Sequence, residues 1–413
     1  MDAALGVLDG IRILDLSQGA AGPVAGMVLG EYGAEVIKID PPAGDWGRGL
    51  GPPFLDEDAA AYWGMNRNKR SLCVNLKMPE GVEIVRGLAR HSDVVLESFR
   101  PGVMDRLGMG YEVLAGEQPG LIYCAISAFG TEGPWRDKPG VDGIIQAMSG
   151  LMSVTGEPAG QPVKVGVPAA DMTAALVAVQ GILLAVLARM RSGRGQRVDV
   201  SLLDSLFFLQ TVPWSMYLVS GASPGRQGSA APYSAPNEVY PTQDGFLMVA
   251  AYWPERWKRL TRVLGCPDLA DDRRFSDVRG RVTHRAALFA ELAARFRART
   301  TAEWQRLLEA EDILCAPVME YDHLAKLEHV MNPDRFPRLQ HAAVGVTPGV
   351  AMPARLADHP ARPGRPAPLT GEHTREILTE AGYADAAIDG LIRAGVVQQW
   401  VGGVNAGNAE KRA

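Results

Sequence analysis

Cysteine is scarce in this sequence, and its spacing argues against two kinds of site. The four cysteines, Cys73, Cys124, Cys266 and Cys315, are widely scattered and form no CxxC pair. Neither a zinc site nor a disulfide scaffold is therefore expected. The seven histidines include no HExxH motif either. We expect no metal ion in this protein.

The sequence also lacks a strong excess of charge of either sign. Lys and Arg total 42 and Asp and Glu total 47, so the net charge is −5. A general nucleic-acid binder would be basic, so we expect no nucleic-acid partner. An anionic ligand would need a local cluster of cations. The hydrophobic fraction of 47% excludes a disordered chain.

Targeting and membrane signals are weak as well. The N-terminal segment has no basic stretch followed by a long apolar run, so no signal peptide is expected. The most apolar stretch, Met172–Met190, approaches membrane-spanning length, but it starts after Asp171 and ends in a basic segment at 191–194. We interpret it as a buried core helix of a cytoplasmic protein that has no membrane partner.

Strand-like and helix-like segments alternate in the N-terminal part of the chain. A helix is expected after the glycine turn at Gly19–Gly22 and another over Pro79–Arg90. Strands separated by helices form βαβ units and a parallel sheet. The sequence therefore predicts an α/β fold with a Rossmann-like large domain. The expected strands are Ile11–Leu16, Glu35–Asp40, Ser71–Leu76, Val94–Phe99 and Leu121–Ile126.

The character of the sequence changes after residue 218. Residues 219–236 are rich in Gly and Ser, which is typical of an interdomain linker. A smaller α+β domain is predicted over 237–325, with a strand at Phe246–Ala251 and helices at Arg256–Leu264 and Thr301–Ala310. The Pro-rich segment 326–369 is predicted to be an extended linker that returns to the large domain. Residues 1–218, completed by 330–413, form that large domain.

The turn from Gly19 to Pro23 imitates a dinucleotide-binding fingerprint, with Asp40 at the end of the second strand. However, the GxGxxG spacing is absent, and Pro23 removes a backbone N–H that pyrophosphate would need. A structural turn is favoured over an adapted nucleotide site. An NAD-dependent oxidoreductase is the least favoured alternative.

Basic residues recur close to these turns. Each one alone is best explained as a solvated surface charge. Together they are able to hold a multiply phosphorylated ligand, because phosphate requires charge-assisted donors. These residues are Lys38, Arg48, Arg67, Lys69, Arg70, Lys77, Arg100 and Arg106.

An ordered set of motifs runs along almost the whole chain. The motifs are LDGIRILDL at 8–16, AGP at 21–23, LGEYGAEVIKID at 29–40, NKRS at 68–71, NLK at 75–77, FRPG at 99–102, RLG at 106–108, GLMSVTG at 150–156, RSGRGQ at 191–196 and TGEHT at 370–374. This set resembles the class III CoA-transferases, the CaiB/BaiF family. The resemblance implies an enzyme that moves CoA from an acyl-CoA to a carboxylic acid. It also implies an interlocked homodimer with no tightly bound cofactor, because the coenzyme A thioester is itself a substrate.

Asp171 is the candidate nucleophile. By the residues alone it opens an apolar helix, where free N–H groups and the helix dipole stabilise a carboxylate anion, so it could also be a simple helix cap. The resemblance to formyl-CoA and carnitine CoA-transferases places the catalytic aspartate here. It implies that CoA passes through an aspartyl anhydride and an aspartyl-CoA thioester.

The same resemblance implies a set of CoA-contacting residues. Lys77 and Arg106 keep charges that can meet phosphates. Asp142 and Gln146 are possible polar groups near Asp171, and Gly225–Gly228 falls in the region of a loop that closes over the intermediate. The CoA-contacting positions are Ala20, Ala21, Val74, Lys77, Ser98 and Arg106.

Two alternatives share the fold or the ligand. An α-methylacyl-CoA racemase uses a Gly-His-Asp motif, but this sequence has Gly140-Val141-Asp142, and valine cannot transfer a proton. A non-catalytic CoA-ester binding protein is the second alternative. Succinyl-CoA is the expected donor and a short dicarboxylate the first expected acceptor, although no residue selects among acids.

Overall fold

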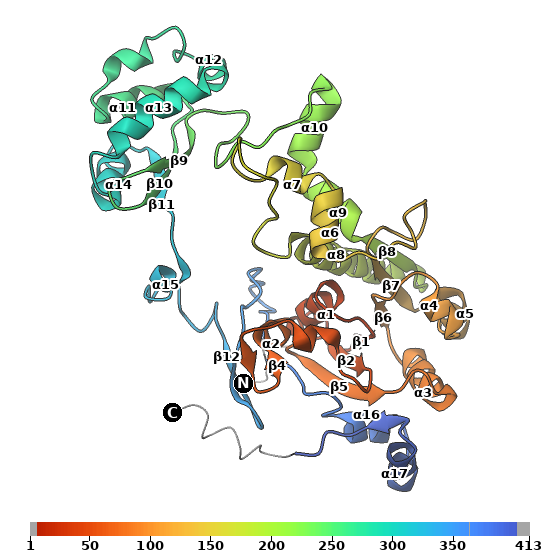
Figure 1. Cartoon of the computed structure of the whole chain (residues 1–413). Helices are drawn as coiled ribbons and strands as arrows, with labels where there is room; N and C mark the ends of the chain where they lie inside the picture. Colours follow the sequence, from red (N-terminus) through yellow and green to blue (C-terminus); the bar gives the residue numbers. More distant parts are fainter. Residues whose placement is uncertain (1–5, 363, 403–413) are drawn as a thin grey trace. The chain divides into compact units, whose positions relative to one another are not determined.

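The chain forms two compact units, which we describe separately. The computed structural model describes residues 6–362 and 364–402 (Figure 1). The larger unit consists of the chain up to residue 149, residues 166–215 and the chain from 331, and the smaller unit of 150–165 and 216–330. The start of the N-terminal segment and residues 403–413 of the predicted large domain lie outside the described residues.

A seven-stranded sheet forms the centre of the larger unit. Its strand order is β14-β5-β2-β1-β6-β7-β8, and every pair is parallel except β14 with β5. Without β14, the chain order of the strands is 3-2-1-4-5-6, the doubly wound arrangement of dinucleotide-binding folds. The predicted parallel sheet and α/β fold are confirmed. The strands are β1 (Arg12–Asp15), β2 (Glu35–Asp40), β5 (Lys69–Val74), β6 (Val94–Glu97), β7 (Ile122–Ser127), β8 (Arg197–Ser201) and β14 (Val397–Gln398).

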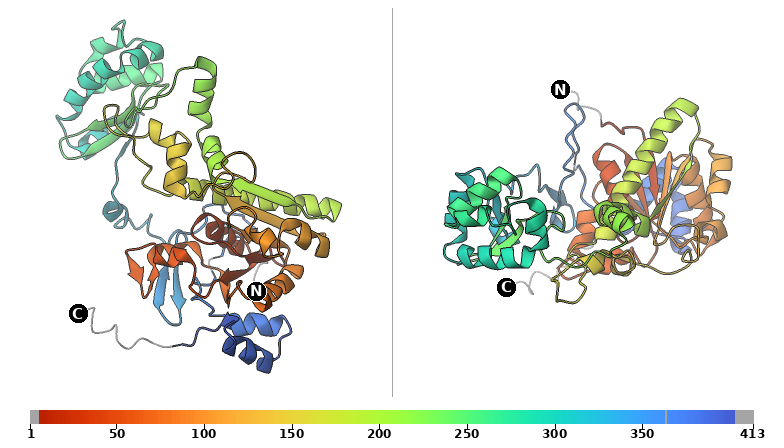
Figure 2. Two further views of the ribbon diagram at one scale, coloured as in Figure 1. Left: turned by 45° about the vertical axis from the view of Figure 1, so that its right-hand side comes forward. Right: turned by 90° about the horizontal axis from the view of Figure 1, so that it is seen from above.

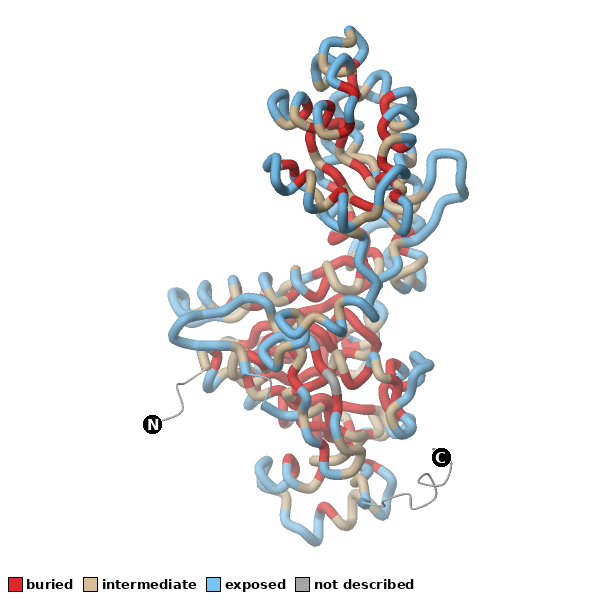
Figure 3. Tube along the Cα trace, turned by 90° about the vertical axis from the view of Figure 1, so that its left-hand side faces the viewer, coloured by how far each residue is buried: buried red, intermediate tan, exposed pale blue. Residues whose placement is uncertain are grey.

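Helices cover both faces of this sheet (Figure 2). One face packs Leu14, Ile37 and Leu72 against α3 (Pro79–Arg90), α5 (Tyr111–Glu117), α16 (Thr374–Glu380) and α17 (Asp385–Arg393). The other face carries α1 (Ala21–Glu31) and α8 (Ala169–Ser192), which also pack against each other. Because strand side chains alternate between faces, the residues between these apolar positions point toward α1. Strands β5, β6 and β7 are accordingly buried along their whole length. Figure 3 shows the buried residues in the interior of the larger unit.

The face toward α1 buries an ionic network. The side chains of Lys38 and Lys69 are completely buried, and that of Arg67 is 1% exposed. Their interpretation as phosphate ligands is therefore wrong: each cation is already neutralised by a buried carboxylate and has no access to solvent. The ion pairs are Lys38–Asp45 at 2.7 Å, Lys69–Asp15 at 2.8 Å, and Arg67–Glu31.

The smaller unit contains a three-stranded antiparallel sheet, β11-β10-β9, covered by helices. In its core Tyr240 stacks on Phe296, and Phe296 contacts Trp304 edge to face. A capping box between Thr300 and Glu303 starts α14 close to the predicted position. The elements are β9 (Asn237–Pro241), β10 (Phe246–Ala250), β11 (Leu314–Pro317), α11 (Pro254–Val263), η2 (Pro267–Ala270), α12 (Val278–Thr283), α13 (Arg285–Phe296), α14 (Thr301–Glu309) and α15 (Tyr321–Leu324).

Shorter elements complete the chain. The predicted extended segment 326–369 contains a hairpin of β12 (Arg338–His341) and β13 (Gly345–Pro348), so it is not extended throughout. The remaining elements are η1 (Trp46–Gly49), β3 (Phe54–Leu55), β4 (Asp58–Ala59), α2 (Ala60–Met65), α4 (Val103–Arg106), α6 (Asp142–Met148), α7 (Leu151–Val154), α9 (Leu202–Leu209) and α10 (Thr211–Ser220).

Helix α8 is buried along one face only, which differs from the predicted core helix. Only 33% of its most apolar window is buried, and by length and composition it could cross a membrane. The bent pair α9 and α10 passes the same test when taken together. Small residues of α8, such as Ala174 and Ala178, are buried within the larger unit, whereas Leu184 and Leu187 are more than half exposed.

Candidate active site

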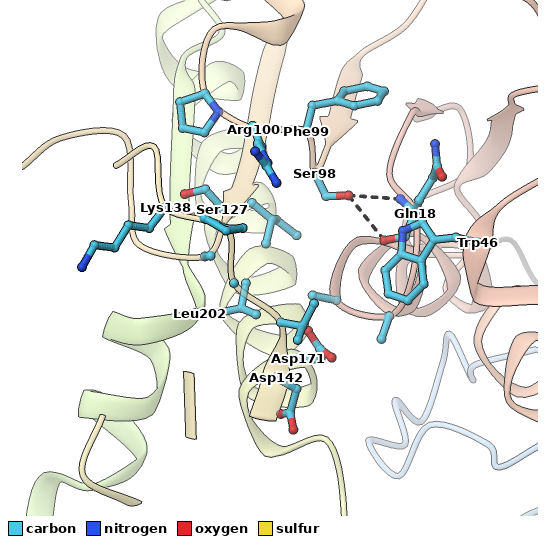
Figure 4. A pocket seen from close by; sticks show the side chains of 18 of the residues that line it. Gln18, Trp46, Ser98, Phe99, Arg100, Ser127, Lys138, Asp142, Asp171 and Leu202 are labelled. Atoms are coloured by element: carbon cyan, nitrogen blue, oxygen red, sulfur yellow. Dashed lines mark hydrogen bonds between the residues drawn. The ribbon is translucent and has the colours of Figure 1, made fainter. Parts of the chain in front are cut away.

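The strand order creates a crevice between the carboxyl ends of β1 and β6. The chain leaves these neighbouring strands in opposite directions, and ligands of doubly wound folds bind at such a switch point. The Ser98 hydroxyl joins the two strand ends, because it accepts the Gln18 N–H at 3.0 Å and donates to the Gln18 carbonyl at 3.4 Å (Figure 4). A pocket of about 400 Å³ opens at this point.

Asp171 lies in the wall of this pocket, in the first turn of α8. The helix starts at Ala169 after Pro168, and no side chain of the N-cap residue forms a capping bond. Asp171 is thus the third helical residue and not the N-cap. Its carboxylate points toward the pocket next to that of Asp142 (Figure 4).

Asp142 and Gln146 support the start of α8 from the neighbouring helix α6. One oxygen of Asp142 accepts the Ala170 N–H at 2.8 Å, which satisfies an amide at the open end of α8. The other accepts Gln146 Nε2 at 2.7 Å, and the same amide group donates to the Val167 carbonyl at 3.3 Å. Since Gln146 is fully buried, these bonds fix Asp142 beside Asp171.

The electrostatic state of Asp171 differs from that of a helix cap. Burial and the carboxylate of Asp142 raise the pKa of Asp171 to about 6 from its ordinary value of 3.8. A helix cap would instead be stabilised as the anion by the helix dipole, which is the state predicted from the sequence. The two raising effects outweigh the dipole, so the ionised carboxylate is more basic than an ordinary aspartate.

The structure brings together four of the seven predicted site residues. Ala20, Ala21, Ser98 and Asp171 all line the pocket. The other three lie elsewhere at the carboxyl ends of the strands. Val74 is buried at the end of β5, Lys77 is exposed in the loop after it, and Arg106 is exposed at the end of α4.

Several further side chains in the wall were not predicted to contact the ligand. Trp46, which is 54% exposed, stands on η1 against the glycine turn after β1. The loop before α6 adds two cations, Arg136 and Lys138. No local motif identifies Trp46, because its position depends on a tertiary contact with Gly19 in the loop after β1. Arg136 and Lys138 could have been found from the sequence, since both lie shortly before Asp142.

Within the residues that the structure describes, no group of three or more His, Cys, Asp and Glu side chains is placed to hold a metal ion. The pocket at the switch point holds a basic carboxylate, that of Asp171. These features are those of an α/β protein with a binding pocket for a small molecule.

Comparison with known proteins identifies the family. Residues 8–374 match the model of CoA-transferase family III. The chain belongs to this family and is a CoA-transferase, which confirms the resemblance seen in the sequence.

Individual relatives match this chain over nearly their full length. The chain is 37% identical over 396 residues to succinyl-CoA:glutarate CoA-transferase of Mus musculus, covering 95% of this chain and 90% of the relative. It is 35% identical over 396 residues to succinyl-CoA:mesaconate CoA-transferase of Haloarcula marismortui, covering 92% and 97%. A crystal structure of a CaiB/BaiF family protein from Brucella suis has a TM-score of 0.82 at 34% identity, covering 91% of this chain and 100% of that chain.

Proposed function

We propose that this CoA-transferase moves CoA from succinyl-CoA to a short dicarboxylic acid, with Asp171 as the nucleophile. The observation that carries the proposal is the basic carboxylate of Asp171 in the wall of the switch-point pocket. The two relatives named above act with succinyl-CoA on glutarate and on mesaconate, which are both short dicarboxylates.

The reaction needs no water and no net proton. The Asp171 carboxylate attacks the thioester carbonyl of succinyl-CoA, and the C–S bond breaks. CoA leaves as the thiolate, and a mixed anhydride between Asp171 and succinate remains. The thiolate then attacks the Asp171 carbonyl, which releases succinate and leaves an aspartyl-CoA thioester. The acceptor carboxylate repeats the two steps in reverse order, and Asp171 is regenerated. Each step is nucleophilic catalysis at a carbonyl carbon.

Charged residues of the pocket suit these steps. A second carboxylate beside Asp171 makes the nucleophile more basic but also repels an incoming acid anion. Arg100, Arg136 and Lys138 line the same pocket and offset that repulsion. Lys77 and Arg106 are exposed cations that can pair with the phosphates of coenzyme A. The full set of contacts that we propose for coenzyme A is the predicted one: Ala20, Ala21, Val74, Lys77, Ser98 and Arg106.

The direct test is an exchange assay. The protein is incubated with succinyl-CoA and a pool of carboxylic acids, and the CoA esters are identified by mass spectrometry. We expect a new dicarboxylyl-CoA in the wild type. Loss of stereochemistry in a chiral 2-methylacyl-CoA, without exchange, would instead support the racemase alternative, and CoA binding without either reaction would support a binding protein.

The rate of transfer should fall in acid as Asp171 becomes protonated. Because the pKa of Asp171 is raised to about 6, the value of kcat/KM is expected to decrease below about pH 6. Asp142→Asn removes the neighbouring charge, so the pKa of Asp171 falls and the acid limb of the pH profile moves to lower pH. The profile is measured with succinyl-CoA.

The matched control is Asp204→Asn, which removes an exposed carboxylate in the first turn of α9, outside the pocket wall. This variant should keep the wild-type profile. An acid limb that is unchanged in Asp142→Asn would show that Asp142 does not act on Asp171 electrostatically.

We also propose that the protein is a cytoplasmic homodimer whose chains interlock, and that a second copy rather than lipid covers the apolar face of α8. Leu176, Leu184, Leu187 and Met190 on that face are 54%, 58%, 53% and 78% exposed. An apolar patch of this kind marks an interaction surface. Light scattering should give twice the 44.3 kDa chain mass.

The variant Leu184→Lys/Leu187→Lys should lower the yield of that dimer, whereas the same change at exposed Leu218 of α10 is the control. A monomer mass for the wild type would contradict the dimer. Partition of the wild type into liposomes would favour a membrane instead.

A further inference from the structure

Two loops at the carboxyl edge of the sheet carry part of the pocket wall. The loop after β1 supplies Gln18 and leads into Ala20 and Ala21, and the loop after β2 supplies Trp46. The two loops are separate in sequence. Their relative position therefore depends on tertiary contacts, and these contacts converge on Asp45.

Asp45 binds both loops with one carboxylate. Its Oδ1 accepts the Gly19 N–H of the first loop at 2.9 Å and the Gly47 N–H of its own loop at 2.8 Å. Its Oδ2 lies 2.7 Å from Lys38 Nζ. Because a carboxylate has two oxygens with about two acceptor sites each, a single side chain can hold all three partners.

Lys38 extends the same connection to the end of β1. Its ammonium group donates to the Ser17 carbonyl at 2.9 Å, so it holds the first loop from a second point. The side chains of Lys38 and Asp45 are both completely buried. Burial disfavours the charge of Lys38, but the carboxylates of Asp40, Asp45 and Asp15 outweigh it and raise the pKa of Lys38. The pair thus stays charged.

The result is a close contact between the two loops. A Cβ atom at Gly19 would lie 2.1 Å from the Trp46 ring, and Gly19 also has a φ of +82°, so only glycine fits there. Trp46 is thereby seated on the glycine turn, and its exposed part forms pocket wall. Neither Lys38 nor Asp45 lines the pocket itself.

We infer that the buried Lys38–Asp45 ion pair is a positioning device that fixes Trp46 and the Gln18–Ala21 turn as one rigid wall for the CoA ester. The inference rests on the proposed function, since the wall matters only if the pocket binds that ester. Lys38 and Asp45 are positioning residues and act through the two loops. A wall that is loose by about 1 Å weakens a site even when every contacting residue is present.

The test compares Asp45→Asn with Glu31→Gln. Both changes neutralise a buried carboxylate that pairs with a buried cation and accepts backbone N–H donors, two for Asp45 and that of Met352 for Glu31. Glu31, however, pairs with Arg67 at the far end of α1. We expect Asp45→Asn to weaken binding of free CoA, measured by calorimetry, and to raise the KM for succinyl-CoA about tenfold, with kcat changed less than about threefold. Glu31→Gln should keep the wild-type values at a similar loss of thermal stability.

Hydrogen exchange gives a readout that does not depend on turnover. Amides of residues 16–20 and 46–49 should exchange faster in Asp45→Asn than in the wild type. Trp46→Ala, at an exposed side chain, should raise the KM similarly without lowering thermal stability, so the inference remains testable even if Asp45→Asn folds poorly.

The outcomes separate cleanly. If the wild type binds CoA and both Asp45→Asn and Trp46→Ala bind it equally well, the pair is merely structural and the inference is wrong. If the wild type itself binds no CoA, the proposed function fails instead.

Discussion

Asp171→Asn is expected to abolish CoA transfer and at the same time to stabilise the protein at pH 7. Asparagine has nearly the same shape but cannot attack a thioester, so the rate should fall at least about a thousandfold, as for other covalent nucleophiles. The exchange assay with succinyl-CoA measures this loss. No aspartyl-CoA thioester should be trapped on the variant.

The gain in stability follows from the sign of the pKa shift. The pKa of Asp171 is about 6 in the folded protein and 3.8 ordinarily, so at pH 7 the fold holds an anion that it disfavours. Each pKa unit corresponds to about 1.4 kcal/mol, so removing this charge should stabilise the protein by up to about 3 kcal/mol. Between pH 6 and 3.8 the folded state binds more protons, so the contribution of Asp171 to wild-type stability improves as pH falls.

The matched control is Asp204→Asn. Asp204 also lies in the first turn of a helix, α9, but it is exposed and is absent from the pocket wall. This variant should keep full activity and lose a few tenths of a kcal/mol, since a helix-end carboxylate is normally stabilising, at about 0.3–1 kcal/mol. A loss of stability in Asp171→Asn would mean that the helix dipole stabilises the Asp171 anion more than burial and Asp142 destabilise it.

Lys69→Met is expected to have the largest effect on stability. Lys69 Nζ lies 2.8 Å from Asp15 and donates to Asn66 Oδ1 at 2.9 Å, and both ionic side chains are completely buried. Removing the cation leaves the Asp15 carboxylate buried without its partner, which typically destabilises a protein by about 3–5 kcal/mol. Thermal and urea unfolding of the larger unit measure this loss.

Two further variants test the reason for that loss. Lys69→Met/Asp15→Asn removes both charges and should recover part of the stability. Lys258→Met is the same change in an exposed pair with Glu255, whose side chains are 59% and 75% exposed, and it should alter stability by less than about 0.5 kcal/mol. Equal midpoints for Lys69→Met and Lys258→Met would mean that the buried pair contributes nothing.

Local patterns were sufficient for five of the seven strands of the central sheet, β1, β2, β5, β6 and β7. The strand Glu35–Asp40 and the helix Pro79–Arg90 have the predicted bounds, because each has a clear periodicity and Pro79 marks the first turn of the helix. Strand β8 was missed since its sequence, RVDVS, is short and has exposed polar positions. Its place is set by pairing with β7, which no local pattern reveals.

The site residues could be predicted from the sequence only where a motif within one segment of the chain identifies them. The motif predicts Asp171 as the nucleophile, and the structure places this side chain in the pocket wall, in the first turn of α8. The raised pKa does not follow, because it depends on Asp142 in another helix. The sequence predicts solvent exposure for Lys38 and Lys69. Nothing in their local sequence shows that they form buried ion pairs with Asp45 and Asp15.

The antiparallel strand β14 has a consequence for how the protein is made. Val397 and Gln398 pair with β5, the third strand of the sheet in chain order, and Asn75 N–H donates to the Val396 carbonyl beside them. During synthesis, β5 leaves the ribosome more than three hundred residues before its edge partner. An unpaired strand edge invites pairing with other chains, so the nascent protein exposes this edge of β5 until residues 397 and 398 have been synthesised and have paired with it. Removal of Val397 and Gln398 should therefore promote aggregation.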